Sequence, residues 1–236
     1  MRHGIIAATL FISALGAQAG TIISANLPSG SIIVNVDATV DGAATNSGFG
    51  ADPYAYWYHP FNNASGPLLS TTVQAGTYTF RIVDPADASV LFSSLTSSDL
   101  SKIYTAWTYN SPYITDIVVF DGSAATNTSV SQLFDVAPNT QGYSDAASAY
   151  AAEVTSGYYN QIQVGNRDSG NFQTSYTFAT ATTLIFAVPD NGLGDNLGGT
   201  SILIQSTGAG DAPEPGTFGL IAGAAAIALA ARRFCR

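Results

Sequence analysis

The sequence predicts an all-β protein, an antiparallel β-sandwich with one short helix. β-Branched and aromatic residues recur in short alternating or continuous runs, and clusters of Gly, Pro, Asn and Asp separate these runs. This pattern is typical of strands joined by turns. About ten short strands at this spacing favour two packed antiparallel sheets over strands that alternate with helices. Jelly-roll and immunoglobulin-like connectivity both remain open.

Segment 70–83, STTVQAGTYTFRIV, is the best candidate for a hairpin, because Ala75-Gly76 joins two alternating runs and glycine tolerates turn dihedrals. All the predicted strands share the alternating or apolar pattern. They are Ser31–Val36, Tyr54–His59, Leu68–Val73, Thr77–Val83, Ile103–Tyr109, Ile114–Phe120, Tyr158–Val164, Phe172–Phe178, Thr183–Val188 and Ser201–Gln205.

One segment predicts a helix, from about Asp145 to Thr155, across an end or edge of a sheet. Ser144 can serve as its N-cap, good helix formers follow, and Gly157 comes directly after the end. We expect Glu153, the only glutamate between the two terminal segments, to point from this helix into water.

The central part of the chain, residues 20–210, is strongly acidic and long enough for one domain with its own core. Its basic residues are Arg81, Lys102 and Arg167, against fourteen acidic residues from Asp37 to Asp195. Such a surface repels nucleic acid and anionic membranes, which leaves neutral sugars and divalent cations as plausible partners. The one cysteine, Cys235, lies in the C-terminal tail, so this domain has neither a disulfide nor a thiol nucleophile, and its core must hold it together.

The first nineteen residues predict a secretory signal peptide with a short apolar helix. Arg2 is followed by an apolar stretch from Ile5 to Leu15, and then by Ala17-Gln18-Ala19. Small residues at the first and third positions before a cut suit signal peptidase, so cleavage is expected after Ala19. We therefore expect the protein to be exported.

The C-terminal segment, residues 211–236, combines a short apolar run with a basic end. Gly216–Ala231 would form a helix of about 24 Å, short of the roughly 30 Å hydrocarbon layer, and alanine and glycine make up most of it. Arg232, Arg233 and Arg236 would keep the end of the chain on the cytoplasmic side. This pattern predicts a temporary membrane helix and a poor permanent anchor.

Just before this helix stands Pro213-Glu214-Pro215, which holds the backbone extended, the form in which proteases usually bind a chain. The order of a Pro-Glu-Pro motif, an apolar helix and terminal arginines closely resembles the PEP-CTERM sorting tail. The resemblance covers about the last twenty-five residues. It implies an inner-membrane intermediate, removal of the tail by an exosortase, and delivery to the surface or matrix of a Gram-negative bacterium that makes exopolysaccharide.

A loop rich in oxygen ligands follows the predicted strand Thr183–Val188. Asp190, Asn191, Asp195 and Asn196 supply carboxylate and amide oxygens, and four nearby glycines let backbone carbonyls approach. Hard cations such as calcium take six to eight oxygens in flexible geometry. The loop is similar to the late-strand calcium loop of galactose-binding β-sandwich lectins, which implies a galactose-binding-like sandwich, although an ordinary polar hairpin loop has the same composition.

The stretch YAYWYHPFNN places Tyr54, Tyr56 and Tyr58 on one face of a strand and Trp57 and His59 on the other. Exposed tyrosine rings would stack on sugar rings, whereas Trp57 is the better candidate for the core. For the second tryptophan, which has tyrosines nearby, core and ligand roles both remain open.

Catalytic motifs are scarce in this sequence. His59 is the only histidine after the signal segment, and no Gly-x-Ser-x-Gly elbow occurs. A pair of carboxylates for glycoside hydrolysis remains an alternative. The sequence therefore favours a non-enzymatic component of the extracellular matrix or biofilm, with calcium-assisted carbohydrate binding as its candidate activity, over a secreted hydrolase that acts on glycans.

Overall fold

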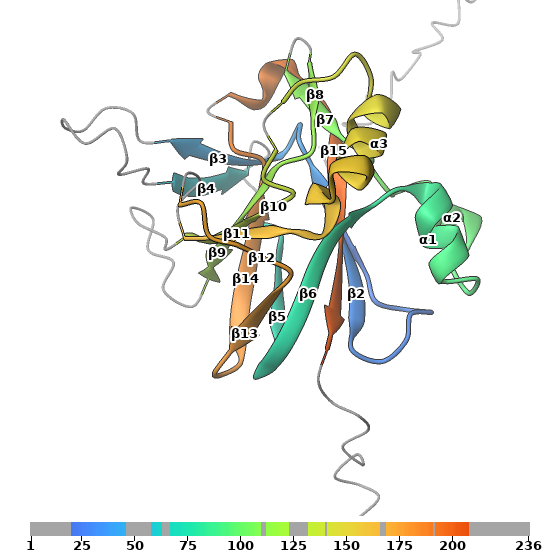
Figure 1. The fold of residues 1–236 in the computed structure, drawn as a ribbon, viewed down its shortest axis with the longest axis vertical. Helices are drawn as coiled ribbons and strands as arrows, with labels where there is room; N and C mark the ends of the chain where they lie inside the picture. The colour runs from blue at the N-terminus through green and yellow to red at the C-terminus, as the bar shows by residue number, and fades with distance from the viewer. Residues whose placement is uncertain are drawn as a thin grey trace, which may run out of the picture.

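The computed structural model describes residues 20–45, 58–62, 67–109, 112–122, 132–139, 141–165, 169–190 and 192–207. These residues form two antiparallel sheets that pack face to face, with three α-helices on one side (Figure 1). The predicted antiparallel β-sandwich is confirmed. The predicted signal helix and C-terminal membrane helix lie outside the described residues.

The first sheet has the strand order β1-β2-β15-β6-β13, and β7 joins it by pairing with β15 and with β8. The long strand β15 holds this sheet together, because it pairs with β2, β6 and β7. The strands are β1 (Thr21–Ile23), β2 (Ser31–Asp37), β6 (Gly76–Val83), β7 (Trp107–Tyr109), β8 (Tyr113–Ile114), β13 (Ser175–Phe178) and β15 (Asn196–Ser206).

The second sheet has the strand order β12-β11-β10-β9-β14-β5. Every pairing in it is antiparallel, and a register shift interrupts the β9–β10 pair. Its strands are β5 (Ser70–Val73), β9 (Ile117–Asp121), β10 (Gln132–Val136), β11 (Ile162–Val164), β12 (Phe172–Gln173) and β14 (Thr182–Ala187).

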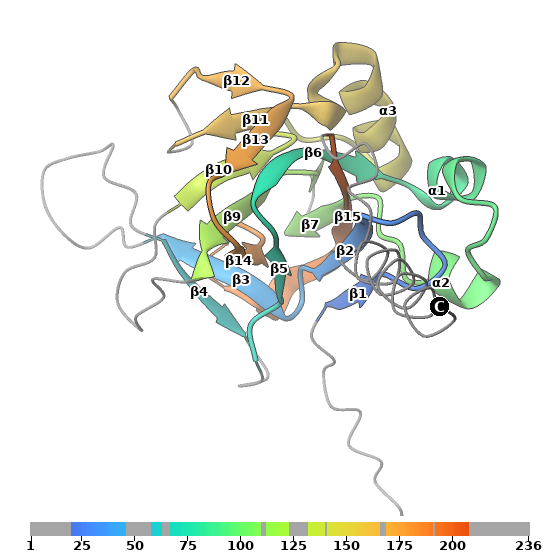
Figure 2. The same ribbon diagram turned by 90° about the horizontal axis from the view of Figure 1, so that it is seen from below.

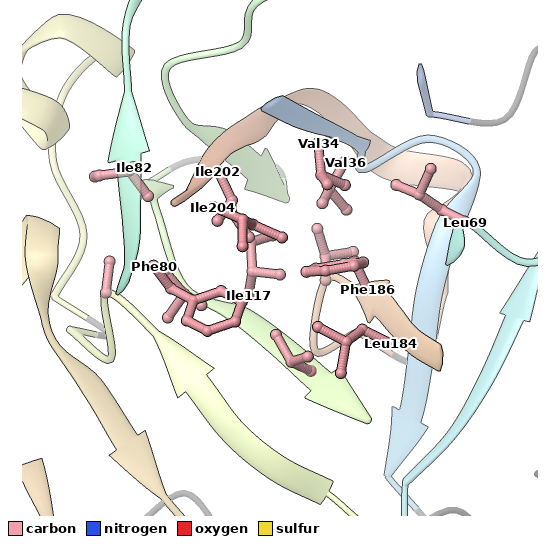
Figure 3. Close-up of a cluster of buried hydrophobic side chains, with 14 of the residues drawn as sticks. Val34, Val36, Leu69, Phe80, Ile82, Ile117, Leu184, Phe186, Ile202 and Ile204 are labelled. Atoms are coloured by element: carbon pink, nitrogen blue, oxygen red, sulfur yellow. The ribbon is translucent and has the colours of Figure 1, made fainter. Parts of the chain in front are cut away.

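The main hydrophobic core lies between the two sheets. Alternate residues of each strand point inward, as the two-residue period of a strand requires. Burial of each such side chain contributes about 1.5–3 kcal/mol to folding. Figure 3 shows the centre of this core, which both sheets supply, with Val34, Val36, Phe80, Ile82, Ile202 and Ile204 from the first sheet and Ile117, Leu184 and Phe186 from the second.

The outer face of the first sheet is covered by helices α1 (Pro85–Leu91) and α2 (Ser97–Leu100). Ile33, Val83 and Leu203 point outward from this sheet and pack against Ala88 and Phe92, all buried. Both helices have local caps: the Asp84 side chain accepts a hydrogen bond from the Asp87 amide, and Thr96 and Asp99 form a capping box.

The outer face of the second sheet carries a smaller apolar cluster beside the pair β3 (Asp41–Thr45) and β4 (Tyr58–Asn62). Val118 and Phe120 point outward from β9 and pack with Ala43 of β3. Strand β9 is apolar on both faces because the main core covers one face and the β3–β4 pair covers the other. Figure 2 shows the β3–β4 pair and the helices on opposite sides of the sandwich.

The hairpin prediction for segment 70–83 is wrong. Strands β5 and β6 do follow each other through Ala75, but β5 pairs with β14 in the second sheet and β6 pairs with β15 and β13 in the first. The chain crosses between the sheets at this point, so that Val73 and Phe80 enter the same core. Alternation and a turn residue indicate that the chain reverses, but they do not indicate which sheet each strand joins.

The helix prediction is confirmed by α3 (Ala146–Ser156). Asp145, rather than Ser144, is the N-cap: its side chain accepts a hydrogen bond from the Ser148 amide at 2.8 Å. Gly157 ends the helix in the left-handed conformation, at φ 82°, where glycine has no Cβ to strain.

Other boundaries differ from the prediction. The segment predicted as Tyr158–Val164 begins as a short 3₁₀ turn, η2 (Tyr158–Asn160), and becomes strand only as β11. Of the predicted strand Tyr54–His59, residues 54–57 lie outside the described residues. The sequence did not predict strands β1, β3 and β10 or helices α1 and α2. Strand β10 shows no strict alternation, since both Asp135 and its apolar neighbours are buried.

Candidate functional site

The predicted calcium loop keeps only part of its ligand set together. Asp190 Oδ1 accepts a hydrogen bond from the Gly192 amide at 3.2 Å. Its second carboxylate oxygen, Oδ2, is buried and has no hydrogen-bond partner within the described ranges. Asp195 lies exposed on the 3₁₀ turn η3 (Leu193–Asp195), and Asn191 falls outside the described residues.

Asn196 does not point out of the loop. It is the first residue of β15, its side chain is buried, and its Nδ2 donates a hydrogen bond to the carbonyl oxygen of Ala38 at 3.1 Å. Its Oδ1 is also buried, without a hydrogen-bond partner in the described part of the chain. Two predicted ligands, Asp190 and Asn196, therefore each have a buried oxygen that is available to coordinate a cation.

The loop is tied to the β2–β3 turn. The Ala43 amide donates to the Val188 carbonyl at 2.8 Å, and the Val188 amide donates to the Asp41 carbonyl at 3.0 Å. The Ala38 amide in turn donates to the carbonyl of Gly198 at 3.0 Å. The start and end of the predicted loop are therefore held against one short segment of the chain, residues 38–43.

Several predicted site residues belong to segments outside the described ranges. The sorting motif Pro213-Glu214-Pro215, the basic cluster Arg232, Arg233 and Arg236, and the tyrosines Tyr54 and Tyr56 lie outside the described residues. Tyr58 is the first residue of β4, and only its backbone is described.

Trp107 is a core residue. It is 1% exposed, and its indole nitrogen donates a hydrogen bond to the carbonyl oxygen of Asp116 at 3.1 Å. Tyr109, whose ring centroid lies 5.9 Å from that of Trp107, is partly exposed at the end of β7. Of the two readings left open for the second tryptophan, this packing favours the core.

Sequence reasoning missed a group of buried acidic side chains beneath helix α3. Glu153 and Asp116 are both fully buried, which corrects the expectation that Glu153 points into water. Glu153 lies four residues after Ala149, so both occupy the helix face that packs on the sandwich. Asn139 Nδ2 donates a hydrogen bond to Glu153 Oε1 at 2.6 Å.

Burial raises the pKa of Glu153 from its ordinary 4.5 to about 7, opposed by the Asn139 hydrogen bond and reinforced by the nearby Asp116 carboxylate. A raised carboxyl pKa beside a second carboxylate is a feature of some catalytic pairs. Here neither side chain is accessible, so a substrate could not reach them in this conformation. One sequence signal does point to Asp116: it interrupts the apolar run from Ile114 to Phe120.

A second buried acid lies at the β2–β3 turn. Asp41 is 2% exposed, and its Oδ2 accepts hydrogen bonds from the amides of Gly20 at 2.9 Å and Asp37 at 3.1 Å. Burial raises the pKa of Asp41 from 3.8 to about 6; the two amide hydrogen bonds lower it, and the charge of Asp37 raises it.

Within the described ranges, no group of three or more His, Cys, Asp or Glu side chains is placed to hold a metal ion. Nowhere in the described part of the chain does a helix reach the length and hydrophobicity of a membrane span. Comparison with protein-family models, curated proteins and solved structures found no match. The chain is therefore classified by its fold, an antiparallel β-sandwich.

Proposed function

We propose that this protein is exported and then sorted to the cell surface or extracellular matrix of a Gram-negative bacterium, where the β-sandwich acts as a non-enzymatic structural or carbohydrate-binding component. The observation that carries the proposal is the pairing of an N-terminal signal sequence with a C-terminal Pro-Glu-Pro, apolar and basic segment. Signal peptidase and an exosortase would be its processing partners, and exopolysaccharide its candidate ligand.

The topology supports a jelly-roll form of the sandwich. Eight strands form two facing sets, in the orders β2-β15-β6-β13 and β5-β14-β9-β10, and all of their pairings are antiparallel. Along the chain, each of these strands lies in the other sheet from the one before it, as the β5–β6 crossing illustrates, except that β9 and β10 pair within the second sheet. This is the strand order of a jelly roll. Lectin domains are among the proteins built this way, so the topology is compatible with sugar binding but does not by itself define it.

The proposal is non-enzymatic because a hydrolase needs two carboxylates that a glycan can reach. One pair of neighbouring acids, Asp116 and Glu153, is fully buried where helix α3 packs on the sandwich. Glycan hydrolysis by another carboxylate pair is the alternative, and it predicts loss of activity by orders of magnitude when one of two specific aspartates is replaced.

The sorting prediction is tested by mass spectrometry of the secreted protein from cells that contain an exosortase. We expect a chain that begins at Gly20 and ends near Pro213, and accumulation of a form that retains its tail when the exosortase gene is deleted. Recovery of the intact chain, including Arg236, from exosortase-containing cells would contradict the prediction.

Calcium binding is tested by thermal unfolding with millimolar calcium and with a chelator. The buried oxygens of Asp190 and Asn196 support a site at this loop. At a hundredfold excess over Kd, binding would stabilise the fold by about 2.7 kcal/mol and raise Tm by roughly 5–10 °C.

Asp190→Asn should reduce this shift, because it removes the charge yet keeps the oxygen that accepts from Gly192. Asp145→Asn makes the same charge change at the N-cap of α3, where asparagine also caps well, and should leave the shift intact. A Tm that calcium does not change, or a shift equal in the two variants, would rule out a site at Asp190.

A further inference from the structure

The amino end of the described chain packs directly on a buried acid. Gly20 stands immediately before β1, whose first residue, Thr21, pairs with Asn35 of β2. The Asn35 Nδ2 donates a hydrogen bond to Thr21 Oγ1 at 3.0 Å, which fixes this end of β1 on the sheet. The Gly20 nitrogen then lies 2.9 Å from Asp41 Oδ2.

Asp41 lacks a cationic partner among the described residues. Its Oδ1 is buried, and in the described ranges it has no hydrogen-bond partner. The ionisable groups around it are Asp37, which adds like charge, and Tyr104, whose hydroxyl donates to Asp37 Oδ2 at 3.3 Å. An isolated buried carboxylate is costly, and a buried carboxylate of this kind is expected to be paired with a cation.

Residue 20 must be glycine in this arrangement. A Cβ at that position would overlap the carbonyl oxygen of Asn35, the Asp41 carboxylate and a methyl group of Leu69. The absence of a Cβ therefore lets the backbone nitrogen lie within hydrogen-bond distance of the Asp41 carboxylate. The same residue is the first one after the predicted signal-peptidase cut.

We propose that cleavage after Ala19 converts the Gly20 nitrogen into an α-ammonium group that forms a buried ion pair with Asp41, so that the mature amino terminus completes the fold. This inference rests on the export proposed above. In the precursor, the Gly20 nitrogen is an amide with one hydrogen, which it already donates to Asp41 Oδ2. The ammonium group has three hydrogens and a positive charge, so it can also donate a hydrogen bond to Asp41 Oδ1.

The proposal makes the precursor the less stable form at neutral pH. Between the ordinary carboxyl pKa of 3.8 and an amine pKa of about 8, Asp41 and the free amino terminus are both charged when the chain is unfolded. Only the processed chain can keep both charges on folding, because they neutralise each other. Removal of the signal peptide would then stabilise the domain as well as release it.

The test compares two forms of the chain that both end at Arg236. One begins at Gly20 with a free amine, left by a site-specific protease, and the other is the same protein acetylated at Gly20. Acetylation keeps the N–H that donates to Asp41 but removes the charge. At pH 7 we expect the unfolding equilibrium constant of the acetylated form to be at least about tenfold larger, as for loss of one partner of a buried pair. The difference in stability between the two forms should shrink toward pH 4, because Asp41 of the acetylated form then becomes protonated and no longer buries an unpaired charge.

The control is Asp41→Asn made in both forms. It should abolish the difference between them, whereas Asp145→Asn, far along the chain on α3, should leave it unchanged. If Asp41→Asn does not fold, the pKa of the Gly20 amine measured by NMR replaces it, and we expect a value above the ordinary range of about 7.7–8.0. Equal stabilities at pH 7, a difference that survives Asp41→Asn, or an unshifted amine pKa would overturn the ion pair.

N-terminal sequencing of the secreted protein tests the export separately. A start at Gly20 supports the proposal. A start at any other residue would overturn it as a feature of the mature protein, even if the two purified forms differ in stability.

Discussion

Replacement of Glu153 by glutamine should make the protein more stable at pH 8, by about 3 kcal/mol. Glu153 is fully buried, and its pKa is raised from 4.5 to about 7. At pH 8 the folded protein must therefore hold a carboxylate in a buried site beside Asp116. Glutamine keeps an oxygen for the hydrogen bond from Asn139 and has no charge to bury.

The direction of the pH dependence follows from proton binding. Between pH 4.5 and about 7 the folded state retains the Glu153 proton while the unfolded state has lost it, so stability falls as the pH rises through this window. A shift of one pKa unit corresponds to about 1.4 kcal/mol, which sets the size of the effect. Below pH 4.5 Glu153 is protonated in both states, and wild type and Glu153→Gln should have similar stabilities.

The measurement is urea unfolding of both proteins from pH 4 to pH 8, with the same amino terminus. Asp41, whose pKa is also raised by burial, changes stability in the same direction, but it is present in both proteins and cancels in the difference. A Glu153→Gln protein that loses stability in parallel with wild type as the pH rises would show that Glu153 does not carry the buried proton.

Replacement of Phe134 by alanine should lower the free energy of unfolding by about 3–5 kcal/mol. Phe134 lies on β10 and is fully buried between the sheets. Its ring centroid is 4.7 Å from that of Phe80 in the opposite sheet and 5.1 Å from that of Tyr176. Alanine would leave a cavity where the two sheets meet, and the paired strands around it limit how far the site can collapse.

Phe172→Ala is the matched control, because the same atoms are removed at a sheet edge. Phe172 is 44% exposed on β12 and touches Tyr158, at 5.9 Å between ring centroids. We expect its loss to cost less than about 1.5 kcal/mol, since only about half of its surface leaves water on folding. Urea unfolding near pH 5 compares the two variants, and equal losses would mean that Phe134 is not central to the core.

Local chemistry in the sequence determined much of the secondary structure. A continuous β-branched run predicts β2 and an alternating run predicts β6, because a strand of a sandwich packs one or both of its faces in apolar surroundings. The helix from residue 146 to 156 is bounded by an acidic N-cap and a glycine, and those groups act within one turn of the backbone. The sequence alone predicts the conformation of residues whose interactions are with neighbours a few positions away in the chain.

The tertiary structure alone decided which strands share a sheet and which polar groups are buried. Strands β5 and β6 are adjacent in the chain but belong to different sheets, because each is paired by a strand more than one hundred residues away. Glu153 lies on an alanine-rich helix with no clear apolar stripe, so only the packing of α3 reveals its burial. Gly20 and Asp41 meet because β1 pairs with β2 and the chain then turns back. Such contacts depend on long-range pairing, for which a linear pattern of residue types carries no signal.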